Sequence, residues 1–171
     1  MSLLSYLFAP RPDPAAALRP LWARTVAIAR EAGWYAKGGV ADSVAGRFDM
    51  LSLVLAAVLL RMEREPALVE PSVRLTELFV ADMDGQLREQ GIGDPALGKR
   101  MGHLVSALGG RLGALREAFA GEEPALIEAV QRNVTFGVAG QPQRVAAELR
   151  FLAGQLDALP AAALLAGEIE R

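Results

Sequence analysis

The sequence predicts an all-α fold, a single globular domain of about six helices packed around one central apolar helix. The first observation is an uncharged stretch, residues 50–60, in which apolar side chains occupy nearly every face of a helix. The second is that polar and apolar residues nowhere alternate with period two over a length that would support a sheet. The third is a series of prolines, glycines and capping residues that divides the chain into helix-sized segments.

The first predicted helix spans residues 14–32. Asp13 followed by Pro14 is a favourable cap and first-turn pair, and Gly33 fits the position after the last turn. Residues 34–39, where two aromatic side chains stand beside glycines, are expected to form a loop. The inward face of this helix is expected to comprise Leu18, Leu21, Trp22, Val26 and Ala29.

The central helix is predicted over residues 47–64, with Asp42 or Ser43 as the cap of the segment that leads into it. Its uncharged part would be only about 16 Å long, against the roughly 30 Å of a bilayer core, so we expect it to be covered by protein. A break is expected over residues 65–71, because a proline disfavours the helical conformation in the residue before it.

Four more helices complete the prediction: residues 72–90, 95–119, 124–133 and 142–159. In the first of them, the expected core positions are Val73, Leu75, Leu78, Phe79, Met83 and Leu87. The second carries a stripe of small residues at helical spacing: Gly98, Gly102, Ser106 and Gly109 or Gly110. Because each glycine costs up to about 1 kcal/mol in a helix interior, we expect another backbone to approach this stripe closely.

The predicted domain comprises residues 14–159, with an N-terminal arm at residues 1–13 and a C-terminal tail at residues 160–171. The arm is apolar but has neither the basic n-region nor the cleavage pattern of a signal peptide. Docking on the domain is the favoured interpretation of the arm, and weak contact with a membrane surface is the alternative.

The composition excludes several kinds of site. The chain has no cysteine, and His103 is its single histidine, which excludes disulfides, thiolate metal sites, histidine triads and His-rich metal sites. The net charge of -2 gives no footprint for nucleic acid, and no nucleotide-binding motif is present. We therefore predict no catalytic residues, no metal and no cofactor. The 52% hydrophobic content fits either a plain alanine-rich bundle or a protein that keeps an apolar groove for a hydrophobic client.

Two stretches resemble a known family. Residues 42–50 read Asp-Ser-Val-Ala-Gly-Arg-Phe-Asp-Met, with Trp34 and Tyr35 ahead of them and Leu-Leu-Arg-Met at 59–62 behind. Residues 79–101 contain an acidic pair, then Leu-Arg-Glu, Gly-Ile-Gly-Asp and Gly-Lys-Arg-Met. Both blocks, in this order, are similar to the ubiquinol–cytochrome c chaperone family, and the resemblance covers residues 34–133.

The resemblance implies an all-α, non-enzymatic assembly chaperone of the cytochrome bc1 complex, whose client is newly made cytochrome b. It also implies a second partner, either the ribosome or another assembly factor. The chain shows no transit sequence and has a bacterial composition, so we expect a bacterial cytoplasmic protein with at most peripheral membrane contact. The alternative is a small helical ligand-binding protein or an enzyme of unknown substrate.

The chain departs from the family pattern at three positions. The family often has a histidine where Val54 stands, an aromatic residue where Gly109 stands, before Gly110 and Arg111, and a tyrosine near Leu115. If these positions touch the client, the departures bear on which client this chain binds and not on its fold.

Two sets of residues are predicted to bind the client or a partner. The first, expected to wall one end of a groove, is Trp34, Tyr35, Arg47 and Phe48. Its alternative is structural, with the aromatic rings in the core and the arginine extended along the surface. The second set, expected to present a fixed charge pattern, is Asp82, Asp84, Arg88, Asp94, Lys99 and Arg100. Helix capping and an Asp84 to Arg88 pair explain part of the second set, but not two basic residues near a helix start.

Overall fold

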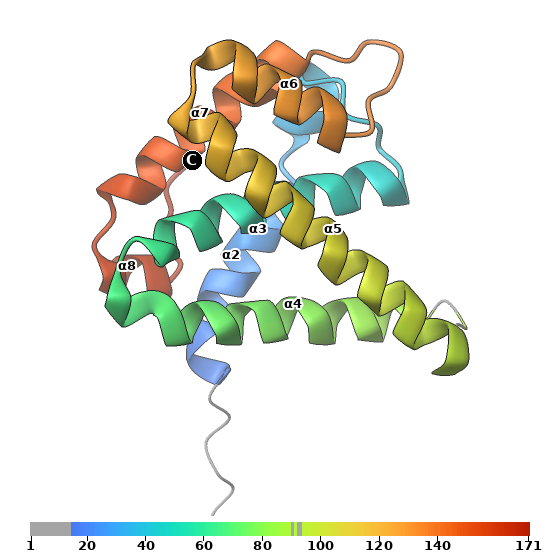
Figure 1. Ribbon diagram of the computed structural model, residues 1–171, viewed down its shortest axis with the longest axis vertical. Helices are drawn as coiled ribbons and strands as arrows, with labels where there is room; N and C mark the ends of the chain where they lie inside the picture. The colour runs from blue at the N-terminus through green and yellow to red at the C-terminus, as the bar shows by residue number, and fades with distance from the viewer. Residues whose placement is uncertain (1–14, 90, 92–93) are drawn as a thin grey trace, which may run out of the picture.

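The computed structural model describes residues 15–89, 91 and 94–171, so the predicted N-terminal arm lies outside the described residues. Within them the fold is all-α, as predicted (Figure 1). The α-helices are α2 (Arg19–Ala29), α3 (Val44–Glu63), α4 (Val69–Glu89), α5 (Asp94–Ala120), α6 (Glu123–Asn133), α7 (Pro142–Ala158) and α8 (Ala161–Leu165). Two short 3-10 segments, Ala16–Leu18 and Pro66–Leu68, precede α2 and α4, and a π-helical turn, Gly33–Lys37, follows α2.

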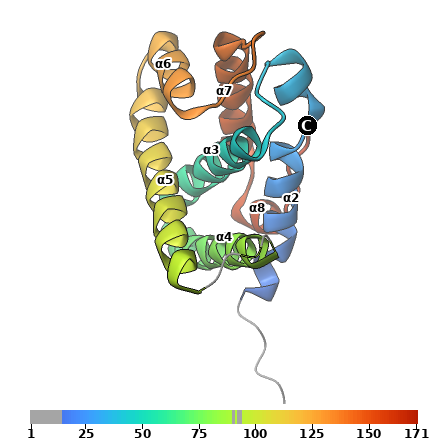
Figure 2. The same cartoon turned by 90° about the vertical axis from the view of Figure 1, so that its right-hand side faces the viewer.

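Helix α3 is the predicted central helix. Figure 2 shows it in the middle of the molecule with α2, α4, α5 and α7 around it. Every residue from Met50 to Leu60 is buried, because the apolar side chains that point in all directions meet a covering helix on each side. Ser43 caps the helix, since its side-chain oxygen accepts a hydrogen bond from the Gly46 amide at 3.2 Å.

The first predicted helix is shorter than expected. Helix α2 begins at Arg19 instead of residue 14, with Pro20 in its first turn, where a missing amide proton costs no hydrogen bond. It ends at Ala29, and the residues expected to form a loop make the π-helical turn instead. This turn buries Trp34, whose indole Nε1 donates to the Ile28 carbonyl at 2.7 Å.

The expected break before α4 is also shorter than predicted. Helix α4 begins at Val69, so Pro71 is its third residue and occupies a position whose amide has no partner within the helix. Leu75, Phe79 and Met83 are buried as predicted, but Val73 is 53% exposed and does not belong to the core. The face of α4 that packs in the core is therefore narrower than the face that the sequence pattern predicted.

The prediction of close backbone contact along the glycines of α5 is wrong. A Cβ atom at Gly98, Gly102, Gly109 or Gly110 would meet no atom within 4 Å apart from the adjacent backbone of its own helix. Gly39 shows the opposite situation: its φ is +69°, and a Cβ there would lie 2.2 Å from the Ala139 carbonyl oxygen. Glycine is required in the turn before α3 but not along α5.

The C-terminal residues pack on the body of the protein. Leu164 of α8 and Ile169 are buried, and the Arg24 Nε of α2 donates to the Ile169 carbonyl at 2.8 Å. A short antiparallel contact pairs Val40 with Phe136 and joins the turn before α3 to the loop before α7. The start of α3 is thus held by a segment almost a hundred residues away in sequence.

Candidate functional site

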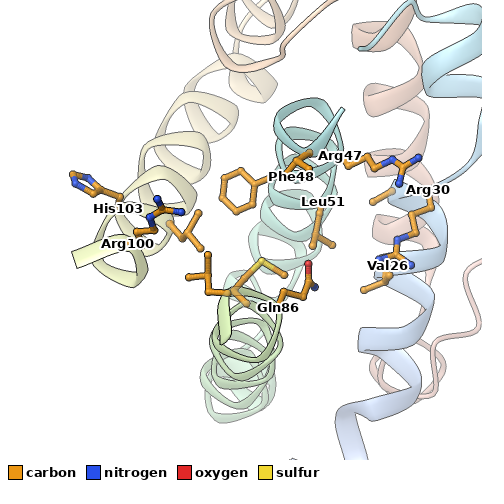
Figure 3. A pocket seen from close by; sticks show the side chains of 13 residues that line it. Val26, Arg30, Arg47, Phe48, Leu51, Gln86, Arg100 and His103 are labelled. Atoms are coloured by element: carbon orange, nitrogen blue, oxygen red, sulfur yellow. The ribbon is translucent and has the colours of Figure 1, made fainter. Parts of the chain in front are cut away.

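The candidate site is a groove with a volume of about 420 Å³ formed by α2, α3, α4 and α5 (Figure 3). It lies over the first two turns of α3, between the end of α2, the end of α4 and the early part of α5. Its apolar lining consists of Val26, Ala29, Val44, Phe48, Leu51, Met83, Leu87 and Leu104. Its polar lining consists of Arg30, Arg47, Gln86, Arg100 and His103.

The floor of the groove belongs to the hydrophobic core. Leu51 and Met83 are buried, and the half-buried Phe48 ring packs against Phe79 with 6.4 Å between ring centroids. Val44 stands at the lip, 78% exposed, and extends the apolar surface outward. An apolar surface that is continuous from core to solvent is typical of a site that receives another apolar group.

Basic side chains border the groove, and none of its lining residues is acidic. Figure 3 shows Arg30 and Arg47 on one side of the apolar floor and Arg100 and His103 on the other. The Arg47 Nε donates to the Asp42 carboxylate at 2.6 Å, and this hydrogen bond lowers the pKa of Asp42 and raises that of Arg47. Both of these side chains are exposed.

A buried polar network fixes α3 behind the groove. The Asp49 carboxylate accepts hydrogen bonds from the Arg111 guanidinium and, at 2.8 and 2.7 Å, from the backbone amide and hydroxyl of Thr135. Arg111 also donates to the Asn133 carbonyl at 3.2 Å, and its guanidinium lies 5.4 Å from the centre of the Phe48 ring. Because Asp49 directly follows Phe48 in α3, this network anchors the start of α3, and the Arg111 guanidinium, which is not part of the groove lining, packs on the Phe48 ring.

The structure divides the first predicted set. Arg47 and Phe48 line the groove. Trp34 does not: it is buried, and the Arg171 guanidinium lies 4.7 Å from the centre of its ring. Tyr35 borders a neighbouring hollow that shares Arg30 and Arg47 with the groove, and its hydroxyl donates to the Ala29 carbonyl at 2.8 Å. Burial raises the pKa of Tyr35, while the nearby Arg47 partly opposes this shift.

Of the five residues in the second predicted set whose side chains the structure describes, only Arg100 lines the groove. Asp84 pairs with Arg88 at 2.8 Å, and the Asp82 carboxylate accepts from the Gln86 amide at 3.2 Å. Lys99 is exposed on α5 outside the groove, and the side chain of Asp94 lies outside the described part of the chain. The five described residues of this set therefore do not line one groove together.

Several groove residues were missed by sequence reasoning. Val26 and Leu51 were interpreted as core, whereas each presents part of its side chain to the groove. Arg30 directly follows the last residue of α2, and His103 lies in α5, four positions after Lys99. Neither residue belongs to a recognisable sequence motif. No sequence signal marks these residues, because the groove exists only where four helices meet.

Among residues 15–89, 91 and 94–171, no group of acidic or histidine side chains could hold a metal ion. Nor does any helix in these ranges combine the length and the apolar character needed to cross a bilayer.

Two comparisons with known proteins point to the same kind of protein. The family model described as ubiquinol-cytochrome C chaperone matches residues 36–171. A crystal structure of the Cbp3 homolog from Brucella abortus is similar, with a TM-score of 0.77 and 35% sequence identity over 90% of this chain and 87% of that one. No curated protein sequence matches the chain.

These features define an all-α protein with an open apolar groove bordered by basic side chains. The chain belongs to the ubiquinol-cytochrome C chaperone family. The match extends beyond the resemblance seen in the sequence, which ended at residue 133, and reaches the last residue. Val54 and Leu115, where the chain departs from the family pattern, are both fully buried and face the core instead of the groove.

Proposed function

We propose that this protein is an assembly chaperone of the cytochrome bc1 complex that binds a hydrophobic segment of newly made cytochrome b in the groove between α2, α3, α4 and α5. The observation that carries the proposal is the apolar floor, continuous from the buried Leu51 and Met83 to the exposed Val44, in a chain of this chaperone family. A membrane-protein segment outside a bilayer needs a surface that shields its apolar side chains from water.

The groove suits a helical segment. Helix-in-groove recognition uses an apolar cleft between packed helices, into which a partner helix inserts residues at i, i+3, i+4 and i+7. Here the walls come from four helices whose positions are fixed by the core and by the Asp49 network, so a client helix meets a surface that is already formed. The chaperone needs no catalytic group for this role.

The charged residues outside the groove are assigned to a second contact in this proposal. Asp82, Asp84, Arg88 and Lys99 lie on α4 and early α5, beside the groove but not in its lining. A ribosomal surface or another assembly factor is the partner that we infer for them.

The test is complementation of a strain that lacks the gene. The groove variant carries Val44→Asp and Leu87→Asp, which place carboxylates on the apolar lining. Val44 tolerates an acid, because it is exposed in the first turn of α3, where negative charge is favourable. The matched control carries Val138→Asp and Phe151→Asp, two exposed apolar residues away from the groove.

We expect the deletion strain and the groove variant to lack assembled bc1 complex, and the control to restore it, with similar melting temperatures for both purified variants. A normal amount of bc1 complex in the deletion strain would contradict the proposal and favour the small-ligand alternative. Full assembly with the groove variant would show that the client binds elsewhere.

A further inference from the structure

The charged residues that line the groove all carry the same sign. Arg30, Arg47 and Arg100 line it together with His103, and its lining contains no carboxylate. The first turn of α3, which forms part of the wall, also lacks an acidic residue, so the partial positive charge of that helix end adds to the same field. An apolar partner alone would leave the charges of Arg30 and Arg100 without a counterpart, whereas Arg47 already pairs with Asp42.

Within the described part of the chain, the guanidinium groups of two of these arginines have no partner. The Arg30 amide donates to carbonyls of α2, but neither the Arg30 guanidinium nor the Arg100 guanidinium makes a hydrogen bond or an ion pair with another residue of the described ranges. The second large hollow, between α3, α5 and α7, differs in this respect: there Arg64 pairs with Asp157 at 2.8 Å and Arg116 with Glu63 at 2.9 Å. The Arg30 and Arg100 guanidinium groups are therefore available to a ligand, whereas Arg64 and Arg116 of the other hollow are neutralised by their carboxylate partners.

The basic groups also stand on opposite sides. Arg30 and Arg47 come from the end of α2 and the start of α3, and Arg100 comes from α5 across the apolar floor (Figure 3). A lipid would place one anionic head group at one end of its chain. A helix with an apolar stripe and acidic residues on both flanks of that stripe would meet arginines on both sides at once.

We propose that the groove selects an amphipathic helix whose apolar stripe is flanked by carboxylates, with Arg30 and Arg100 as the residues that bind those carboxylates. Arg47 contributes less, because the Asp42 carboxylate already holds its Nε. The inference rests on the proposed chaperone function and names the chemistry of the client segment that the groove accepts. Charge on both sides fixes the position of a helix in the groove and raises the rate of encounter.

The probe is a labelled helical peptide of leucines at i, i+3, i+4 and i+7 with glutamates on both flanks, and a second peptide in which glutamine replaces each glutamate. Binding to the full chain is measured by fluorescence anisotropy at low and high salt. The test variant carries Arg30→Gln and Arg100→Gln. The control carries Lys37→Gln and Arg144→Gln, which remove the same charge from exposed positions outside the groove.

The wild-type protein should bind the glutamate peptide about threefold to thirtyfold more tightly than the glutamine peptide at low salt, as expected for two exposed charge pairs. In the test variant, this preference for the glutamate peptide should disappear, and in the control variant it should persist. For the wild-type protein, the preference should weaken as the salt concentration rises. Equal binding of the two peptides, absence of binding, or the same loss in the control would overturn the proposal.

A membrane surface is the competing source of negative charge. Vesicles that contain phosphatidylglycerol are therefore tested in parallel, and loss of vesicle binding in the test variant with an unchanged peptide preference would overturn the proposal in favour of a lipid. The complementation strain separates this inference from the proposed function. If Arg30→Gln with Arg100→Gln restores full bc1 assembly while the groove variant does not, the carboxylate preference is wrong and the chaperone function stands.

Discussion

Asp49 of α3 and Arg111 of α5 form an ion pair that is almost fully buried, and the Arg111 guanidinium lies over the Phe48 ring of the groove. The two residues are 62 positions apart in the sequence, and their contact joins α3 to α5. Asp49 also accepts both hydrogen bonds from Thr135, so the loop before α7 is tied to the same carboxylate. One acidic residue at the entry of an apolar helix thus fixes three segments around the groove.

We expect Arg111→Met to lower the free energy of unfolding by about 3 to 5 kcal/mol, because the Asp49 carboxylate would stay buried without a counter-charge. Arg116→Met is the matched control on the same helix: its pair with Glu63 is exposed and contributes about 1 kcal/mol or less. The double variant Asp49→Asn with Arg111→Met should be more stable than Arg111→Met. Urea unfolding of the three variants checks this order, and equal losses for Arg111→Met and Arg116→Met would contradict it.

The Arg47 guanidinium sets the ionisation of two neighbours. It lowers the pKa of Asp42 through their hydrogen bond and counteracts the increase that burial causes in the pKa of Tyr35. Arg47→Ala should therefore raise the pKa of Asp42 toward its ordinary value and raise the pKa of Tyr35 further above its ordinary value. NMR titration of labelled aspartate and tyrosine, in a Tyr6→Phe background, measures both, and an unchanged Tyr35 pKa would contradict the proximity of the two side chains.

The same pKa shifts determine how stability depends on pH. Tyr35 has a raised pKa in the folded protein, so its contribution is present below the unfolded pKa and is lost as the pH rises through the folded value. For Asp42, whose pKa is lowered, the contribution is present above the unfolded pKa and is lost as the pH falls through the folded value. Because the Arg47 pair is exposed, we expect almost no change in melting temperature for Arg47→Ala at neutral pH.

The glycines of α5 and the glycine of α3 should respond oppositely to alanine. Gly98→Ala and Gly102→Ala should each stabilise the protein by about 0.5 to 1 kcal/mol, because alanine is the better helix former and its Cβ meets no atom within 4 Å apart from the adjacent backbone of its own helix. Gly46→Ala should destabilise it, since a Cβ there would lie 2.0 Å from the Ala41 carbonyl oxygen. Chemical denaturation distinguishes these signs, and a loss of stability at Gly102 would indicate a contact that the fold does not show.

Much of the fold was predictable because it depends on local chemistry. The uncharged stretch of residues 50–60 predicted the buried centre of α3, and Ser43, one of the two residues predicted as candidates for its cap, is the cap. Prolines near the starts of α6 and α7 located those helices to within a residue or two. The π-helical turn was not predictable, because it depends on the distant contacts that bury Trp34.

The candidate site was less predictable. Arg47, Phe48 and Arg100 were named from the sequence and line the groove, whereas Trp34 and Lys99 do not. A groove made by four helices depends on which face of each helix is left uncovered, and hydrophobic periodicity does not distinguish a core position from a groove position. The ion pair behind it was missed for the same reason, since its two residues meet only in the folded chain.

The most direct measurement of the central claim is site-specific photo-crosslinking in cells that synthesise cytochrome b. A photoreactive phenylalanine analogue replaces Val44 at the lip of the groove in one strain and Val138, a fully exposed residue in the loop before α7, in the other. Our account predicts an adduct with cytochrome b from Val44 and none from Val138. An adduct from Val138 without one from Val44 would contradict the assignment of the groove as the client-binding site.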